Sequence, residues 1–215
     1  MLRASLRQII IVALLPSFAT TVGVAAAETR PANLVIRIYD GTSADAASRA
    51  AAIQTAAAVI AGAGIHAAWY DCTRELQRPG CTPSRRGREL IIRIMPAPAP
   101  GTTLTGGSLE TRSNAGTVRL ILGFAVIDPA SVVGVLATIF MDRVEAIAHR
   151  IDVPLSSVLG SAIAHEVGHL LLGTPTHGLS GLMREVWTEE ELALGREEDW
   201  LFTPSERHIL QTLQP

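Results

Sequence analysis

Two histidines spaced four residues apart carry the clearest chemistry in this sequence. His165 and His169 flank Glu166 in the segment HEVGH, which lies in a stretch that we predict to be helical. Four residues advance a helix by about 400° and about 6 Å, so both imidazoles project from one face. Two histidine nitrogens placed in this way can bind one Zn²⁺ ion. This is the H-E-x-x-H motif of zinc hydrolases. It predicts His165 and His169 as metal ligands and Glu166 as the catalytic general base that acts on a zinc-bound water.

The residues around this segment support the metal hypothesis. Ala-Ile-Ala precedes it at 162–164 and Leu-Leu-Leu follows it at 170–172, so most of the predicted helix is apolar and should be buried. The alternative is a polar helix face with unrelated histidines. Two buried histidines and a glutamate would cost several kcal/mol without polar partners. A bound divalent cation removes that cost, and the cofactor that we expect is one catalytic Zn²⁺.

A catalytic zinc site needs a third protein ligand and an open position. His177 is the leading candidate because it follows the helix stop at Gly173, where a sharp turn can bring it back toward the same ion. A glutamate from the following segment is the alternative, and three are available there: Glu185, Glu189 and Glu190.

The segment HEVGHLLLGTPTHGLSGLM (165–183) resembles the extended motif H-E-x-x-H-x-x-G-x-x-H and downstream Met-turn of the metzincin clan of zinc metallopeptidases. It also resembles exported bacterial proteins of unassigned role that carry a similar HExGHLLLG…H…GxM segment. The resemblance implies that His165, His169 and His177 are zinc ligands, that Glu166 is the general base, and that Met183 is the Met-turn residue. This chain departs from the clan pattern because its third histidine comes two residues later.

The resemblance also implies a substrate and a way of binding it. Clan members hydrolyse peptide bonds and hold an extended substrate along an edge strand. We expect residues 117–128 to be that strand, with an ordinary core strand as the equal alternative. Clan members commonly place a tyrosine near the Met-turn to support the oxyanion. The only tyrosines here, Tyr39 and Tyr70, lie far upstream.

The rest of the chain predicts an α+β fold. β-rich segments at 33–40, 65–72 and 89–95 predict strands, and residues 134–141 fit either a strand or the start of a helix. We expect helices at 44–61 (capped by Ser43), 142–149 and 154–172, and a last short helix opened by Thr203. Together with the resemblance, this order predicts a zincin-like small mixed sheet packed against helices, with a long HExxH helix and a short helical C-terminal part.

The first 27 residues have the layout of a secretory signal peptide. Arg3 and Arg7 precede an apolar stretch that ends in Ala25-Ala26-Ala27. An uncleaved membrane anchor is the alternative, because the stretch approaches spanning length. We expect no second apolar run that is long and clean enough to span a bilayer. The expected mature protein is therefore a single zincin-like domain, 28–215, that is secreted or periplasmic and makes no membrane contact after cleavage.

Export of the protein would also allow its two cysteines to form a disulfide. Cys72 and Cys81 are close in sequence and enclose the turn residues Pro79-Gly80, and in an oxidising compartment such a pair most often forms a disulfide. The formal charge of −2 and a pI near 6.3 argue against a nucleic-acid-binding protein, which needs a basic surface.

These observations predict an exported zinc metallopeptidase that acts on a peptide or protein substrate. Two alternatives stay open. One is a zinc-dependent hydrolase of a non-peptide amide. The other is a catalytically inactive binding module that keeps its zinc, which the absent tyrosine and the longer loop would fit.

Overall fold

In the described part of the chain, five strands form one mixed sheet, and apolar side chains of the sheet and the helices pack into one core. The computed structural model describes residues 34–74, 78–82, 88–99, 121–128 and 133–213. The expected signal peptide at 1–27, and the alternative of a membrane anchor there, lie outside these residues. So do residues 117–120 of the expected edge strand. The described residues belong to one compact unit.

The sheet has the order β2-β1-β3-β5-β4. Its strands are β1 (Leu34–Asp40), β2 (Ala67–Asp71), β3 (Arg88–Met95), β4 (Gly123–Asp128) and β5 (Val133–Phe140). All neighbours pair in parallel except β4, which is antiparallel to β5 and lies at the end of the order. The predicted small mixed sheet is therefore confirmed. The open alternative at 134–141 resolves as strand β5, whose β-branched residues suit a strand.

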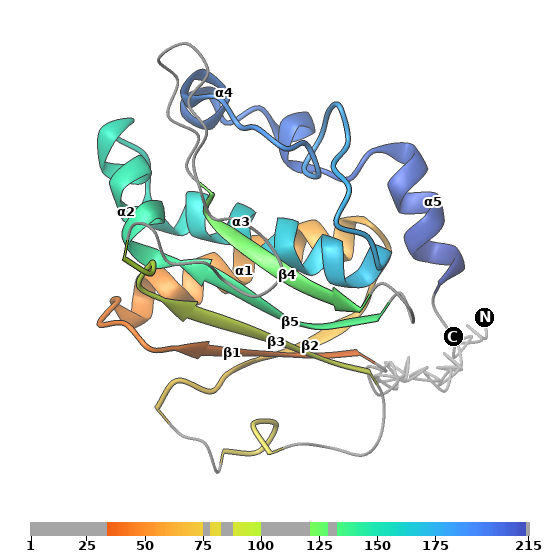
Figure 1. Ribbon diagram of the computed structural model, residues 1–215, viewed down its shortest axis with the longest axis horizontal. Helices are drawn as coiled ribbons and strands as arrows, with labels where there is room; N and C mark the ends of the chain where they lie inside the picture. The colour runs from red at the N-terminus through yellow and green to blue at the C-terminus, as the bar shows by residue number, and fades with distance from the viewer. Residues whose placement is uncertain (1–33, 75–77, 83–87, 100–120, 129–132, 214–215) are drawn as a thin grey trace, which may run out of the picture. The chain divides into compact units, whose positions relative to one another are not determined.

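Helices α1 (Ala46–Gly62) and α3 (Leu155–Leu172) lie on the same face of the sheet (Figure 1). Parallel strands need such crossover helices, and α1 makes the connection from β1 to β2. Alternate residues of the three central strands are buried in one cluster with these helices: Ile36, Ile38, Leu90, Ile92, Ile94, Ala137 and Ile139. This core fixes α3 against the sheet.

The two core helices cross closely because small residues meet at the crossing. A β-carbon built at Gly160 of α3 would lie 2.6 Å from Cβ of Thr55 and 2.8 Å from the carbonyl oxygen of Ala52. Ala52 and Ala56 of α1 are fully buried. The alanine-rich sequence of α1 thus lets α3 approach closely as well as favouring a helix.

Helix α3 corrects one expectation from the sequence. It is long and apolar enough to span a membrane by length and composition, although we had expected no such run after residue 27. However, 78% of it is buried inside the fold. Its apolar sequence is that of a core helix, which packs against the sheet on one side and against other helices on another.

The remaining helices are short and follow the sheet. Helix α2 (Met141–Arg150) leaves β5 directly, and the C-terminal part contains α4 (Glu189–Leu194), the 3₁₀ helix η1 (Glu197–Trp200) and α5 (Pro204–Thr212). Thr203 caps α5 as expected, and it forms a capping box with Glu206. The expected cap Ser43 is wrong for α1. Asp45 is the N-cap, and its carboxylate accepts from the backbone N–H of Ser48.

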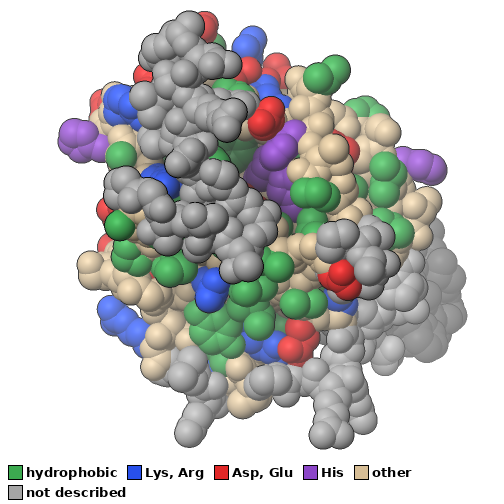
Figure 2. All heavy atoms as spheres, in the orientation of Figure 1, with side chains coloured by type: hydrophobic (Ala, Val, Ile, Leu, Met, Phe, Trp, Pro, Cys, Tyr) green, Lys and Arg blue, Asp and Glu red, His purple; other side chains and the backbone are tan. Residues whose placement is uncertain are grey.

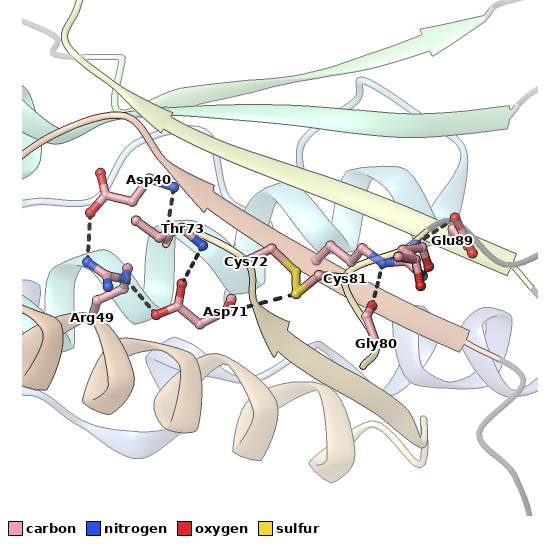
Figure 3. The surroundings of a disulfide bond; sticks show 10 residues. Asp40, Arg49, Asp71, Cys72, Thr73, Gly80, Cys81 and Glu89 are labelled. Carbon is pink, nitrogen blue, oxygen red and sulfur yellow. Dashed lines mark hydrogen bonds and ion pairs between the residues drawn. A yellow bond between two sulfur atoms is a disulfide. The ribbon is translucent and has the colours of Figure 1, made fainter. Parts of the chain in front are cut away.

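The predicted disulfide between Cys72 and Cys81 is present (Figure 3). Arg37 of β1 donates hydrogen bonds to the loop that the disulfide closes. Its guanidinium donates from Nε to the carbonyl of Gly80 at 2.6 Å and from Nη2 to that of Thr82 at 2.7 Å, and it pairs with Glu89 at 2.6 Å. A disulfide of this kind indicates an extracellular or otherwise oxidising compartment.

A buried ion-pair network ties α1 to the ends of two strands beside that disulfide. Arg49 is 3% exposed and contacts Asp40, the last residue of β1, at 3.0 Å and Asp71, the last residue of β2, at 2.8 Å (Figure 3). Thr42 and Thr73 donate to the remaining carboxylate oxygens. Each buried charge therefore has a partner, which removes most of the cost of burying it.

Candidate metal centre

Three histidine side chains converge at the C-terminal half of α3. The Nε2 atoms of His165 and His169 lie 3.1 Å apart, and those of His169 and His177 lie 3.2 Å apart. One nitrogen from each of the three lies within 4.8 Å of the others. Figure 2 shows histidine side chains gathered in a recess near the middle of the face that it draws. The structure therefore brings together the three histidines that the sequence singled out.

The chain after α3 turns sharply enough to return His177 to the helix. Gly173 adopts a left-handed conformation with φ of 66°, which glycine tolerates without steric cost, and its N–H donates to the carbonyl of His169 at 2.9 Å. Farther on, the N–H of Gly178 donates to the carbonyl of Met183 at 2.8 Å. His177 thus sits between a helix stop and a backbone hydrogen bond, and both constrain its position.

Backbone carbonyls fix the protonation of the two helical histidines. Nδ1 of His165 lies 2.8 Å from the carbonyl oxygen of Leu182, and Nδ1 of His169 lies 2.8 Å from that of Thr174. Because a carbonyl only accepts, each Nδ1 must carry the proton and donate it. Each Nε2 then keeps a free lone pair, which is the usual arrangement of a metal-ligating histidine.

The spacing of these lone pairs fits a single zinc ion. The unprotonated Nε2 atoms of His165 and His169, 3.1 Å apart, repel one another unless a cation lies between them. Tetrahedral ligands at 2.0–2.1 Å from zinc lie about 3.3–3.4 Å from each other. The donor set, its spacing and its tautomers therefore fit a site with three histidine ligands.

Burial keeps the helical imidazoles neutral. Removal from water, together with the neighbouring His169 and His177, lowers the pKa of His165 to about 3. Burial likewise lowers the pKa of His169 to about 4, with His177 contributing. Neutral imidazole is the form that binds a metal ion, so both rings are ready to do so at neutral pH.

Glu166 follows His165 in the chain and is buried, and one of its oxygens is unpartnered. Oε2 accepts no hydrogen bond from any residue that the structure describes. Burial raises the pKa of this carboxyl to about 8. A β-carbon built at Gly123, the first residue of β4, would lie 3.0 Å from Oε1. An orphaned buried carboxyl with a strongly shifted pKa is typical of a functional site.

The alternative acidic ligands do not join the cluster. Over the described part of the chain, the group of side chains that could share a metal ion consists of the three histidines. Glu189 instead pairs with Arg150 at 3.0 Å, and both side chains are largely exposed. Glu185 and Glu190 are exposed as well. The geometry therefore favours His177 over a glutamate as the third donor.

Two features of the site were not found from the sequence. One is the pair of carbonyl acceptors on Thr174 and Leu182, which no residue type encodes. The other is Trp187, whose ring meets that of His165 edge-on at a centroid distance of 5.4 Å. Its position four residues after Met183 was the only available signal, and a single aromatic residue at that distance is a weak one.

A known structure shares this arrangement of sheet and helices. The fold is that of an archaemetzincin. The solved structure of archaemetzincin from Methanopyrus kandleri matches 86% of this chain and 97% of its own, with a TM-score of 0.51 and 13% sequence identity. No model of a protein family matches the sequence, and no curated protein matches it. At this identity, the likeness to archaemetzincin establishes the fold alone.

Proposed function

We propose that this chain is an exported zinc-dependent metallopeptidase. The observation that carries the proposal is the convergence of three Nε2 atoms at α3, where the residue after His165 is a buried glutamate with an unpartnered oxygen. The archaemetzincin fold adds support because it has the same layout of sheet and helices. His165, His169 and His177 would hold the ion through Nε2. Bound zinc supplies a Lewis acid that polarises the substrate carbonyl and lowers the pKa of water.

Glu166 would move the proton in this reaction. Its carboxylate would take a proton from the attacking water and pass it to the leaving amine nitrogen as the peptide bond breaks. A positioned general base of this kind contributes about 10²- to 10⁴-fold to a rate. Its place is fixed by α3 on one side and by the close approach of Gly123 on the other, so the carboxyl has little freedom to turn away.

Strand β4 would position the substrate. It is antiparallel, it lies at the end of the sheet order, and its first residue is next to Glu166. An extended peptide pairing with this strand would run past Glu166. Of the edge strand expected at 117–128, the described residues form a strand from Gly123 to Asp128. The proposed partner is a peptide or protein, and we propose no nucleic-acid or membrane partner.

Export of the mature domain, 28–215, to the periplasm or the medium completes the proposal. The disulfide indicates an oxidising compartment, and the sequence layout of residues 1–27 is that of a signal peptide. The absence of a tyrosine near Met183 favours a second candidate function. In this second function, the chain would be a binding module that holds zinc but does not catalyse a reaction.

One comparison of variants tests the proposal. Purified protein should contain about one zinc per chain, as expected for a single site with three ligands. His165→Ala should lose the metal, whereas Glu166→Gln should keep it and lose cleavage of a broad peptide library. Glu190→Gln, an exposed glutamate on α4, is the matched control and should behave like the wild type.

The outcomes separate the candidates. Zinc without any cleavage by the wild type would favour the binding module, and cleavage of small amides but not peptides would favour a non-peptide substrate. Equal activity in wild type and Glu166→Gln would remove the proposed base.

A further inference from the structure

Trp187 contacts the metal centre in two ways. Its indole ring meets the imidazole of His165 edge-on, at 5.4 Å between centroids and an interplanar angle of 89°. Its Nε1–H donates to the carbonyl oxygen of Leu182 at 3.4 Å. The same oxygen accepts the Nδ1–H of His165 at 2.8 Å. A carbonyl has two lone pairs and can serve both donors.

The indole is itself held by the segment after the Met-turn. Trp200 of η1 packs edge-to-face against Trp187, with 5.1 Å between centroids. The guanidinium of Arg184 lies over the Trp200 ring at 5.7 Å and pairs with Glu191 at 3.0 Å and Asp199 at 3.3 Å. Arg184 is only 9% exposed. The indole therefore has little room to move, because a buried ion-pair network fixes its neighbour.

We infer that Trp187 is a positioning residue for the metal centre, and this inference rests on the proposed function. The hydrogen bond from Nδ1 to Leu182 leaves the His165 ring free to tilt about that contact. The indole edge restricts the tilt, and its N–H holds the accepting carbonyl in place. Trp187 thus presets the direction of the His165 Nε2 lone pair before any ion binds. Outer partners of ligating histidines commonly change metal affinity by about 10- to 100-fold.

Co²⁺ binding to the purified full chain, after chelator treatment and dialysis, measures this effect without relying on activity. Trp187→Leu removes the ring and the donor, and it should weaken Co²⁺ binding about tenfold, at the lower end of that range because the contact acts through a carbonyl. It should also shift the d–d absorption of the bound Co²⁺, since the His165 nitrogen no longer keeps one direction. Trp187→Phe keeps a ring edge and loses only the donor, so we expect a loss of about threefold, which one hydrogen bond can account for.

The matched control is Trp69→Leu. Trp69 is also half-buried, but it lies in β2, at the opposite end of the sheet order from β4. This variant should keep the affinity and the spectrum of the wild type. Thermal unfolding of each metal-free variant establishes that it is folded at the temperature of the titration.

The outcomes distinguish failure of the inference about Trp187 from failure of the proposed function. Wild-type affinity and spectrum in Trp187→Leu, or an equal loss in Trp69→Leu, would overturn the inference and leave the proposed function standing. If the wild type itself takes up no Co²⁺, then the proposed function fails first. Should Trp187→Leu not fold, Trp187→Phe decides, and wild-type behaviour in that variant would overturn the inference.

Discussion

The sulfur of Met183 lies against Gly168 in the middle of the H-E-x-x-H segment. A β-carbon built at this glycine would be 2.5 Å from Sδ and 2.9 Å from Cε1 of Phe202. Residue 168 therefore has to lack a side chain if the turn at Met183 is to reach α3. The same turn supplies the Leu182 carbonyl to His165, so this close approach bears directly on the metal centre.

Gly168→Ala should destabilise the protein. Alanine favours a helix over glycine by about 1 kcal/mol, but overpacking a filled core typically costs about 1–3 kcal/mol. Because Met183 and Phe202 are both buried, we expect a net loss in the free energy of unfolding, measured by urea denaturation. Gly62→Ala is the control. A β-carbon there meets nothing within 4 Å, so the substitution should be neutral or stabilising by up to about 1 kcal/mol. Equal stability of the two variants would contradict the packing argument.

His177→Ala should identify the third ligand. Loss of a direct donor should exceed the 10- to 100-fold effect of an outer partner, so we expect zinc affinity to fall by about 100-fold or more. Competition with a coloured chelator measures it. Glu185→Ala is the comparison, because a glutamate ligand would reverse the order of the two variants. Normal zinc binding by His177→Ala would count against the histidine.

The stability of the metal-free protein should depend on pH through the buried cluster. The folded pKa values of His165 and His169 are lowered from 6.5 to about 3 and about 4. As the pH falls from 6.5, the unfolded chain therefore binds protons that the folded chain does not, and stability is lost. The folded pKa of Glu166 is raised from 4.5 to about 8, so its contribution falls as the pH rises from 4.5 to 8. Two histidines outweigh one glutamate below 6.5, and these groups together predict a maximum near pH 6.5.

Urea denaturation of chelator-treated protein between pH 5 and pH 8 would measure this profile. In Glu166→Gln, the decline between pH 6.5 and pH 8 that we assign to this carboxyl should disappear, while the loss below pH 6.5 remains. An unchanged decline in that variant would assign it to another group.

Removing the disulfide should cost stability without changing the metal centre. Cys72 and Cys81 are nine positions apart, and closing a loop of that size stabilises a fold by about 2–3 kcal/mol in the chain-entropy description. We expect that loss in the double variant Cys72→Ser/Cys81→Ser, and a similar one in wild type treated with dithiothreitol. Zinc affinity should stay the same, because β2 lies at the other end of the sheet from β4. A parallel loss of zinc would show that the loop supports the site.

The elements with strong local signals could be predicted from the sequence. The β-rich runs, the alanine-rich helix and the Gly173 stop each have one dominant interpretation, and the disulfide followed from two nearby cysteines. Boundaries were less secure where several residues suit the same role. Both Ser43 and Asp45 are good N-caps, and only the folded chain shows that Asp45 is used.

The sequence predicted which side chains form the site, but it did not predict which backbone groups contact them. The i, i+4 geometry of a helix places His165 and His169 together without further information. His177 remained one of several candidates, because its position depends on a turn whose path is not encoded by spacing. The acceptors on Thr174 and Leu182 and the contact with Trp187 arise only when distant segments meet.

Those two carbonyl acceptors bear on how similar chains would be recognised. Leu182 and Thr174 belong to the stretch between the end of α3 and Met183, and their carbonyls accept hydrogen bonds from the two helical histidines. We expect insertions in this stretch to be tolerated where both oxygens keep these positions. A search pattern with a fixed interval between the second and third histidines passes over this chain. A pattern that leaves this interval variable, and that requires the glycine after the helix and the downstream methionine, would recover it.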